Sequence, residues 1–276
     1  MAGRKSDFTL PTLDDLFSTQ ELRDDAKLSK IRDIPIELID DFPDHPFKVR
    51  DDEDMIQLVE SVKERGVITP ATVRQKEDGR YELISGHRRK RACELAGFEA
   101  LRCEVVDLDR DAATVLMVES NYQRSQILPS EKAFAYKMRL EAMKRQGQRS
   151  DLTSSPVGTK LERSSDELTS ETGDSRNQIH RYIRLTHLIP PLLDLVDSGK
   201  IAFRPAVELS YLTEEEQNSL LDSINSEQST PSLAQALKMK EFSQNGRLNA
   251  DVILSIMCEQ KPNQKEKISF QSERLK

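Results

Sequence analysis

The stretch ISGHRRKRACELAG, residues 84–97, joins a strand-like pattern to a short helix and decides how the first half of the chain folds. It continues the alternating run YELI, residues 81–84, and ends at Gly97, a residue that commonly closes helices. Four cations crowd the first helical turns, where the helix dipole disfavours positive charge: Arg88, Arg89, Lys90 and Arg91. A strand, a glycine and a helix N-terminus form an anion site because the free backbone N–H groups and the dipole point to one place. The stretch therefore predicts a phosphate-binding turn.

Arg88 sharpens this prediction. At 100° per residue it shares a helix face with Ala92, Leu95 and Ala96, the row apolar enough to pack inward. An arginine on such a face needs an anionic partner, since an unpaired buried charge is costly. The partner is either an internal carboxylate or an external polyanion such as a nucleoside triphosphate. Lys90 and Arg91 gain no comparable support and are interpreted as solvated.

Strands and helices alternate on both sides of this stretch. Residues 31–39 read as a strand entering a turn, and residues 100–108 as another strand. Residues 70–75 and 81–85 form a hairpin across a turn containing Asp78-Gly79. Residues 51–67 predict an acid-led amphipathic helix whose apolar face comprises Met55, Leu58, Val59 and Val62. Residues 31 to about 110 therefore make a small α/β unit.

From residue 111 onward the pattern is almost entirely helical. Residues 111–123 and 129–147 predict long amphipathic helices, the second beginning near Pro129 and ending at Gly147. A Ser/Thr/Gly/Pro-rich linker covers residues 148–164. Capping-box patterns then mark helix starts at Ser164, Ser175 and Thr213. Residues 1–30 are interpreted as a flexible acidic tail, and the chain after residue 258 as a loose, charged end.

Composition excludes several classes of protein. No run of about 18 apolar residues and no apolar signal region occur, so no membrane or export role is expected. Three separated cysteines without a metal-ligand spacing favour a reducing compartment, with the cytoplasm as the default. The net charge of −7 is concentrated in residues 1–60, which hold 16 acidic and 8 basic residues, whereas residues 122–149 hold seven Lys/Arg against two Glu. Such a local basic stripe permits nucleic-acid binding.

Three segments in order resemble the three boxes of the ParB partition-protein family: GVITPATVR (66–74), SGHRRKRA (85–92) and ESNYQRSQILPSEKAFAY (119–136). The resemblance extends from about residue 31 to residue 221. It implies an α+β protein: a small mixed α/β, ParB/sulfiredoxin-like N-terminal domain followed by an all-helical helix-turn-helix DNA-binding domain. The implied division is a tail (1–30), a CTP-binding domain (31–121), a helix-turn-helix domain (122–225) and a helical, polar C-terminal segment (226–276).

The same resemblance implies a nucleotide site for CTP and Mg²⁺. Carried over by position, the nucleotide-binding residues are Thr69, Pro70, Arg74, Gly86, His87, Arg88, Arg89, Asn121, Gln123 and Arg124. Glu119 and Asn121 are the metal candidates. Guanidinium groups suit bidentate phosphate binding, which agrees with the arginines. His87 replaces the family's common glutamate, and Ser120 stands where an acid is often found. The sequence thus favours nucleotide binding over hydrolysis, and CTP hydrolysis of low activity is left open.

Residues 164–190 predict a helix-turn-helix from the residues themselves. A short helix from about Asp166 to Thr172 meets Gly173, and a second helix starts at Ser175. Ile179, Tyr182, Ile183 and Thr186 share one face of that second helix, while its opposite face carries Asn177, His180, Arg181 and Arg184. Such a donor-rich face can read base edges in the major groove.

The DNA-binding candidates are Ser175, Arg176, Asn177, Gln178, Arg181 and Arg184, with Lys200 and Arg204 as backbone contacts in a following segment that also resembles ParB. Arg176, Asn177 and Arg181 are the base-edge candidates. Other interpretations stay open for three of the set. Ser175 and Gln178 can form a capping box without any contact to DNA. Arg184 is either a phosphate contact or a structural residue that complements the helix dipole.

The resemblance implies a bacterial, cytoplasmic and nucleoid-associated DNA partition protein: a homodimeric, CTP-dependent clamp that loads at a palindromic double-stranded site and works with a ParA-type ATPase. A plain helix-turn-helix transcriptional regulator with an inactive nucleotide domain is the alternative. A sulfiredoxin-like enzyme is not favoured, because such an enzyme needs a reactive thiolate and Cys93 falls near the inner face of its helix. A nuclease is not favoured either, because no cluster of carboxylates or histidines for a metal stands out in the sequence.

Overall fold

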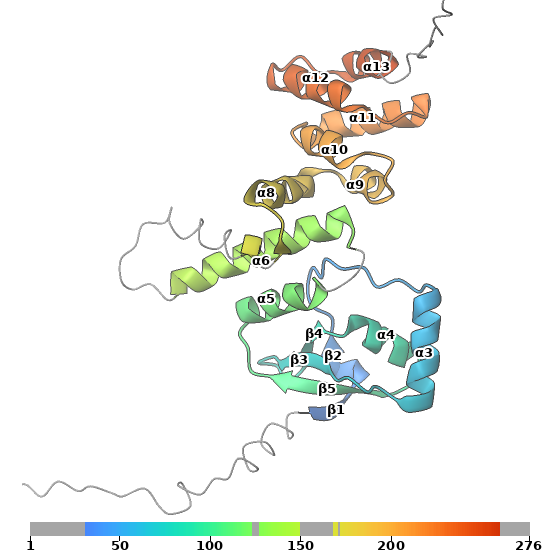
Figure 1. Ribbon diagram of the computed structural model, residues 1–276, viewed down its shortest axis with the longest axis vertical. Coiled ribbons are helices and arrows are strands. Elements are labelled where there is room, and N and C mark those ends of the chain that lie inside the picture. Colours follow the sequence, from blue (N-terminus) through green and yellow to red (C-terminus); the bar gives the residue numbers. More distant parts are fainter. Residues whose placement is uncertain (1–30, 123–126, 150–167, 171, 260–276) are drawn as a thin grey trace, which may run out of the picture. The chain divides into compact units, whose positions relative to one another are not determined.

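The computed structural model describes residues 31–122, 127–149, 168–170 and 172–259 of the chain. The chain forms two compact units, residues 1–120 and 121–276, each with its own core (Figure 1). Among the described residues, no helix has both the length and the apolar character needed to span a membrane.

The first unit is built on a five-stranded mixed sheet of strand order β1-β5-β3-β4-β2. The strands are β1 (Ile31–Pro35), β2 (Ile39–Asp40), β3 (Ala71–Gln75), β4 (Tyr81–Ser85) and β5 (Ala100–Val106). β3 and β4 pair antiparallel, which confirms the predicted hairpin. At its turn the Asp78 carboxylate accepts the Arg80 amide at 2.9 Å, and Gly79 takes a φ of +82°. β3 also pairs with β5 in parallel, so the hairpin joins the centre of the sheet.

Residues 31–39, predicted as a strand entering a turn, form a strand and a turn, and a second short strand follows. β1 ends at Pro35, a 3-10 turn follows at Ile36–Leu38, and β2 pairs in parallel with β4 at the opposite edge of the sheet. Proline supplies no N–H for a ladder, which gives the physical reason for the end of β1. The two apolar residues flanking the turn, Ile34 and Ile39, are both buried in the core.

Two helices, α3 (Glu53–Arg65) and α4 (His87–Ala96), pack against each other, and α4 contacts β3 and β5 (Figure 1). The predicted inner face of α3 is confirmed, since Met55 and Val62 are almost fully buried. In α4 the inward prediction for Leu95 is wrong, because this side chain is 45% exposed. The small side chains Ala92 and Cys93 face the core instead and allow the helix to approach the sheet closely. α5 (Arg110–Asn121) follows β5.

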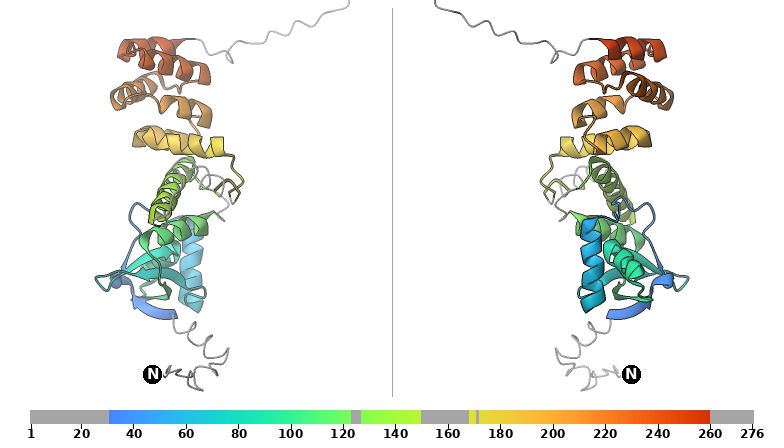
Figure 2. Two further views of the ribbon diagram at one scale, coloured as in Figure 1. Left: turned by 90° about the vertical axis from the view of Figure 1, so that its left-hand side faces the viewer. Right: turned by 90° about the vertical axis from the view of Figure 1, so that its right-hand side faces the viewer.

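The second unit is helical. Its elements are α6 (Pro129–Arg149), α8 (Arg176–Arg184), α9 (Pro190–Asp197), α10 (Phe203–Leu209), α11 (Glu214–Glu227), α12 (Leu233–Gln244) and α13 (Ala250–Cys258), seen from two further sides in Figure 2. A short 3-10 turn, Leu185–His187, follows α8. α6 continues through Gly147 to Arg149, so its predicted end at Gly147 is wrong. An interior glycine costs only about 1 kcal/mol, which a 21-residue helix can absorb.

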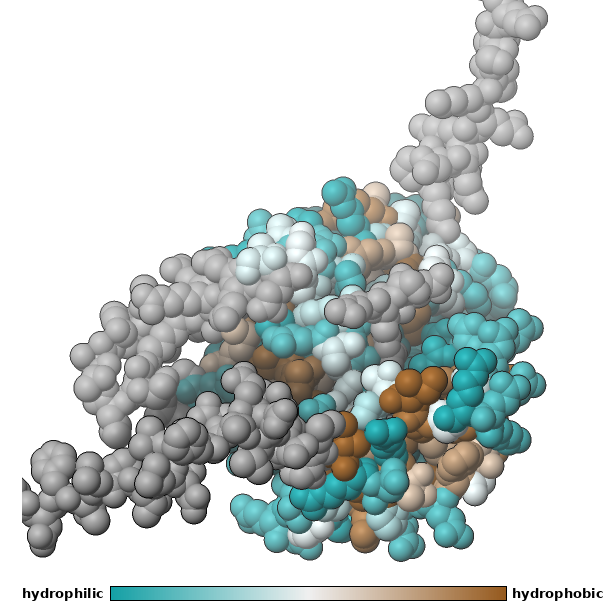
Figure 3. Space-filling view, turned by 60° about the horizontal axis from the view of Figure 1, so that its bottom comes forward, coloured by the Kyte–Doolittle hydropathy of each residue, from teal (hydrophilic) through white to brown (hydrophobic). Residues whose placement is uncertain are grey.

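The main apolar core of this unit extends from Ala133 in α6 to Met257 in α13. A second, smaller cluster comprises Tyr136, Leu140, Leu168 and Ile179. Two helices of the unit start with reciprocal capping boxes, Thr213 with Glu216 and Ser232 with Gln235. The first of these was predicted and is confirmed; the box predicted at Ser164 lies outside the described residues. On the face of the molecule that Figure 3 shows, small apolar patches interrupt a largely hydrophilic surface.

Candidate functional sites

Gly86 forms a tight elbow between β4 and α4. Its φ is +106°, a left-handed backbone that favours glycine, and a Cβ placed there would lie 2.8 Å from the Ala71 Cβ. No side chain caps α4 at this residue, so the first N–H groups of the helix have no cap from it. The predicted strand, glycine and helix N-terminus are therefore present, and the elbow gives an anion close access to backbone donors.

Arg89 connects this elbow to the loop that precedes β3. Its Nη1 donates to the carbonyl oxygen of Thr69 at 2.7 Å and to that of Pro70. Burial lowers the pKa of its guanidinium group. The structure thus brings together two sequence segments, 69–70 and 86–89, that the resemblance assigns to one site.

Arg88 points to a carboxylate of the chain itself. Its Nη2 lies 3.6 Å from Asp52 Oδ1, and both side chains are partly exposed, at 38% and 47%. The Nε of Arg88 is buried and has no hydrogen-bond partner among the described residues. Of the two partners left open by the sequence, the internal carboxylate is present, but it takes up only part of this guanidinium group.

Lys90 and Arg91 do not match their interpretation as solvated cations. Lys90 is 9% exposed, and its Nζ donates to the Ile39 carbonyl at 2.9 Å and to Asp41 at 2.8 Å. Arg91 makes two hydrogen bonds to Asp51, at 2.7 and 3.2 Å, and these raise its pKa. The interpretation is wrong for Lys90 in particular, because its long chain reaches past the helix to a buried carbonyl.

The acidic partners of these cations come from one segment, residues 41–52, between β2 and α3. It supplies Asp41, Asp51 and Asp52 to α4 and stacks the His45 ring on His87, with centroids 3.7 Å apart. His87 itself is 8% exposed. Sequence reasoning missed this segment, although the acidic run DDFPDHPFKVRDD was a visible signal for neutralising nearby cations.

Arg74, a predicted nucleotide ligand, lies on β3 and is paired within the sheet. Its Nε donates to the Glu82 carboxylate on β4 at 2.6 Å, and Glu82 is only 3% exposed. The contact joins the two strands of the hairpin across one register position. In this arrangement Arg74 has a cross-strand partner of its own.

The remaining predicted ligands fall at the boundary of the two units. Glu119 is part-buried near the end of α5, and Asn121 is 6% exposed and begins the second unit. Gln123 and Arg124 lie outside the described residues. Among the residues that the structure describes, no three His, Cys, Asp or Glu side chains gather as a metal site.

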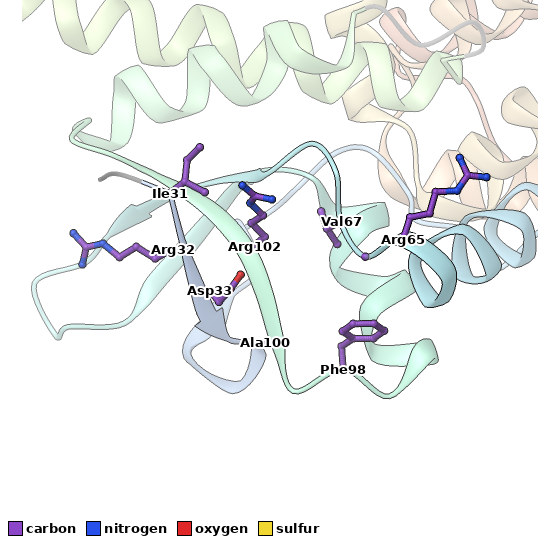
Figure 4. A pocket seen from close by; sticks show the side chains of 9 residues that line it. Ile31, Arg32, Asp33, Arg65, Val67, Phe98, Ala100 and Arg102 are labelled. Carbon is purple, nitrogen blue, oxygen red and sulfur yellow. The ribbon is translucent and has the colours of Figure 1, made fainter. Parts of the chain in front are cut away.

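A hollow at the edge of the sheet, beside β1, contains none of the predicted ligands. Its lining comprises Ile31, Arg32, Asp33, Arg65, Gly66, Val67, Phe98, Ala100 and Arg102. Arg32 and Arg65 lie at its two ends and point in opposite directions (Figure 4). These two arginines therefore do not converge on one point, as the polar groups that fix a ligand do.

The predicted DNA-reading helix is α8, and three of the four residues of its predicted polar face, Asn177, His180 and Arg181, are exposed. Ser175 is the N-cap and accepts the Gln178 amide at 3.3 Å. Ile179 is fully buried, whereas the three base-edge candidates, Arg176, Asn177 and Arg181, are exposed. Gln178 is half-buried beside the cap. Lys200 and Arg204, before and within the start of α10, are both exposed.

Arg184, on the last turn of α8, contacts the two residues that follow α10, Ser210 and Tyr211. Its Nη2 donates to the Ser210 carbonyl at 2.8 Å and its Nε to the Ser210 hydroxyl at 3.2 Å. The guanidinium also lies 4.1 Å from the centroid of the Tyr211 ring, against which Lys240 lies as well. Of the two roles that the sequence left open for Arg184, these contacts favour the structural one.

The turn before α8 is fastened to α6 through Asp174. Its carboxylate accepts the Tyr136 hydroxyl at 2.5 Å and pairs with Lys132 at 3.3 Å. Tyr136 is 1% exposed, and burial together with the Asp174 charge raises the pKa of its hydroxyl. The two α6 residues stand one helical turn apart, so this clamp fixes the start of the candidate reading helix against the long helix.

Replacing Tyr136 with phenylalanine should therefore weaken both the unit and its DNA binding. Loss of a buried, charge-assisted hydrogen bond is expected to lower the free energy of unfolding by about 1.5–3 kcal/mol. Chemical denaturation and fluorescence anisotropy with DNA measure the two effects. Tyr182→Phe is the matched control, since the Tyr182 ring lies 5.8 Å from Tyr136 and its hydroxyl has no hydrogen bond among the described residues. Equal effects of the two variants would contradict the clamp.

Comparison with known proteins gives the relationship of the chain. The ParB N-terminal domain model matches residues 20–122, and the ParB HTH domain model matches residues 156–240. The "Probable chromosome-partitioning protein ParB" of Mycobacterium leprae is 30% identical over 247 residues, which cover 87% of this chain and 68% of that protein. The "Chromosome-partitioning protein ParB" of Caulobacter vibrioides is 29% identical over 177 residues, 63% of this chain.

Solved structures of the C-terminally truncated Caulobacter crescentus ParB are also similar. One, complexed to the centromeric parS site, is 24% identical with a TM-score of 0.43, and covers 76% of this chain and 98% of that one. Another, complexed with CTP-γ-S, is 27% identical with a TM-score of 0.32, and covers 71% and 98%. This chain spans about half the length of the Caulobacter vibrioides relative, 52% of it. With both domain models matched in order and a relative matched over most of its length, the chain belongs to the ParB family.

Proposed function

We propose that this chain is a ParB-type DNA partition protein that loads at a palindromic double-stranded site and closes as a homodimeric clamp when CTP binds. The observation that carries the proposal is the pairing, in one chain, of the Gly86 elbow with the exposed donor face of α8. An anion site alone or a helix-turn-helix alone would fit many proteins; both, inside two matched ParB domains, fit a nucleotide-dependent DNA binder.

The residues at the elbow fit a triphosphate. Gly86 leaves room for close approach, the first N–H groups of α4 supply neutral donors, and Arg88 has a buried Nε without a partner among the described residues. Arg89 already ties Thr69 and Pro70 to the same place, so it can order the loop around a base as well as contact a phosphate. When bound, CTP with Mg²⁺ would supply the negative charge that these cations face.

The predicted ligands then divide by role. Gly86, His87, Arg88 and Arg89 hold the phosphates, and Thr69 and Pro70 border the base. Arg74 orders the hairpin through Glu82 and contributes indirectly. Asn121, Gln123 and Arg124 complete the pocket, with Glu119 and Asn121 as ligands of Mg²⁺. Ser120, an exposed residue in place of an acid, favours binding over hydrolysis.

On DNA, the exposed face of α8 reads bases through Arg176, Asn177 and Arg181, and the α9–α10 segment contacts the backbone through Lys200 and Arg204. Nucleotide binding favours the closed dimer only if CTP binds that state more tightly than the open one. A ParA-type ATPase is the proposed partner, and the bacterial nucleoid in the cytoplasm is the proposed location. Deleting residues 1–30 tests the partner contact: the variant should lose ATPase stimulation, and unchanged stimulation removes that part of the proposal.

Subunit cross-linking tests the function. With cognate DNA, CTP should increase cross-linking between two chains by an amine-reactive reagent, whereas ATP and GTP should not. Arg88→Ala should abolish the response, because the variant loses the guanidinium group at the elbow. Equal responses to all three nucleotides, or a full CTP response of Arg88→Ala, would contradict the proposal.

The transcriptional regulator is the second candidate, and genome-wide DNA occupancy separates it from a clamp. A loading and sliding clamp should give a peak of occupancy centred on a palindromic site. Occupancy should also extend broadly into the flanking DNA, since closed clamps slide away from the site along the duplex. A regulator should give many narrow peaks at promoters.

A further inference from the structure

We propose that Asp52 is the internal counter-anion of the nucleotide site, and that it sets the affinity of this site for polyanions by competing for Arg88. The proposal deepens the proposed function and rests on it for the identity of the ligand. In the structure the Asp52 carboxylate faces Arg88; in the bound state a phosphate group takes its place.

The geometry of the pair suits such an exchange. The contact is long, 3.6 Å, and leaves the buried Nε of Arg88 without a partner among the described residues. Exposed ion pairs of this kind stabilise proteins little, so Arg88 can leave Asp52 at small cost. A phosphate offers three oxygens to a guanidinium fork and can satisfy both edges of the group.

Asp52 also has a second partner that keeps it in place. Its Oδ1 accepts the Met55 amide at 3.0 Å and caps the N-terminus of α3. After Arg88 turns to a phosphate, the carboxylate therefore keeps a hydrogen bond and a favourable helix dipole. The negative charge remains close to the ligand, so Asp52 opposes binding mainly by holding Arg88 and to a smaller extent by repulsion.

The neighbouring Asp51 provides the contrast. It accepts two hydrogen bonds from Arg91, at 2.7 and 3.2 Å, and the resemblance does not assign Arg91 to the ligand. Asp51 carries the same charge as Asp52 and is next to it in sequence. Arg91 also approaches Glu94. The two aspartates therefore differ in which arginine they hold, and this difference isolates the exchange from the overall charge of the segment.

The experiment compares Asp52→Asn and Asp51→Asn in the full chain. Asparagine is as good an N-cap as aspartate, so Asp52→Asn should fold and keep α3. Calorimetric titration with inorganic tripolyphosphate at low salt should show about threefold tighter binding to Asp52→Asn and less than half that gain for Asp51→Asn. The gain should shrink as salt rises, because these groups are partly exposed.

A double-mutant cycle completes the design. In an Arg88→Ala background, Asp52→Asn should lose most of its effect, since there is no arginine left to release. Equal gains for the two aspartate variants, or an undiminished gain without Arg88, would overturn the exchange. Titration of the wild-type protein with CTP, ATP and GTP is a separate measurement. If CTP binds no better than ATP or GTP, the proposed function is contradicted, and the tripolyphosphate titration still decides the role of Asp52. If neither the wild-type protein nor Asp52→Asn binds tripolyphosphate, both the role of Asp52 and the proposed nucleotide site are overturned.

Discussion

Gly86→Ala is expected to lower CTP affinity at least tenfold. A Cβ at this residue would lie 2.8 Å from the Ala71 Cβ and 3.2 Å from the Arg89 Cζ. Both neighbours matter, because Ala71 is fully buried at the start of β3 and Arg89 holds the Thr69–Pro70 loop. Relieving the overlap must move the elbow or Arg89, and a tenfold loss corresponds to only about 1.4 kcal/mol.

Gly97→Ala is the matched control for this variant. Gly97 closes the same helix, has a comparable left-handed φ of +80°, and has no atom within 4 Å of an added Cβ. Each variant should lose about 1–2 kcal/mol of folding free energy from backbone strain, measured by chemical denaturation. Only Gly86→Ala should also lose CTP binding in calorimetric titration. If the two variants bind CTP equally, CTP binding does not depend on a close approach of the nucleotide to the backbone at Gly86.

The parts of this site that sequence could predict are those fixed by local backbone chemistry. The hairpin turn, the glycine elbow and the start of α4 each follow from residues within a few positions of one another, so their patterns are readable. The resemblance to ParB added the order of the three boxes and with it the expectation that Thr69 and Arg89 belong together.

What sequence could not predict depends on partners distant along the chain. Lys90 reads as a surface cation until β2 and the 41–52 segment bring Ile39 and Asp41 to it. Helical periodicity placed Leu95 inward, because a helical wheel cannot tell which side of α4 meets the sheet. Arg184 reads as part of a DNA-facing row until the C-cap of α10 brings Ser210 to it. In each case one face of a short helix is reassigned by tertiary packing.

Arg181 and Arg184 provide the second large effect, because they lie one turn apart on α8 and should respond in opposite ways. Arg181 is exposed on the polar face, so Arg181→Ala should weaken binding to the cognate palindrome by about 1–3 kcal/mol, roughly 5- to 150-fold. Its folding free energy should change by no more than about 0.5 kcal/mol. Fluorescence anisotropy with cognate and scrambled duplexes measures the binding loss and its base dependence.

Arg184→Ala should show the reverse. Removing the guanidinium leaves the Ser210 carbonyl without its donor and uncovers one face of Tyr211, for an expected loss of about 2–3 kcal/mol in folding free energy. At a temperature where the variant stays folded, its preference for cognate over scrambled DNA should remain close to that of the wild type. If the variant is as stable as the wild type but no longer prefers cognate over scrambled DNA, Arg184 contacts bases and the structural role is wrong. Because the two arginines share one helix and one charge, the comparison separates reading DNA from holding the reading helix in place.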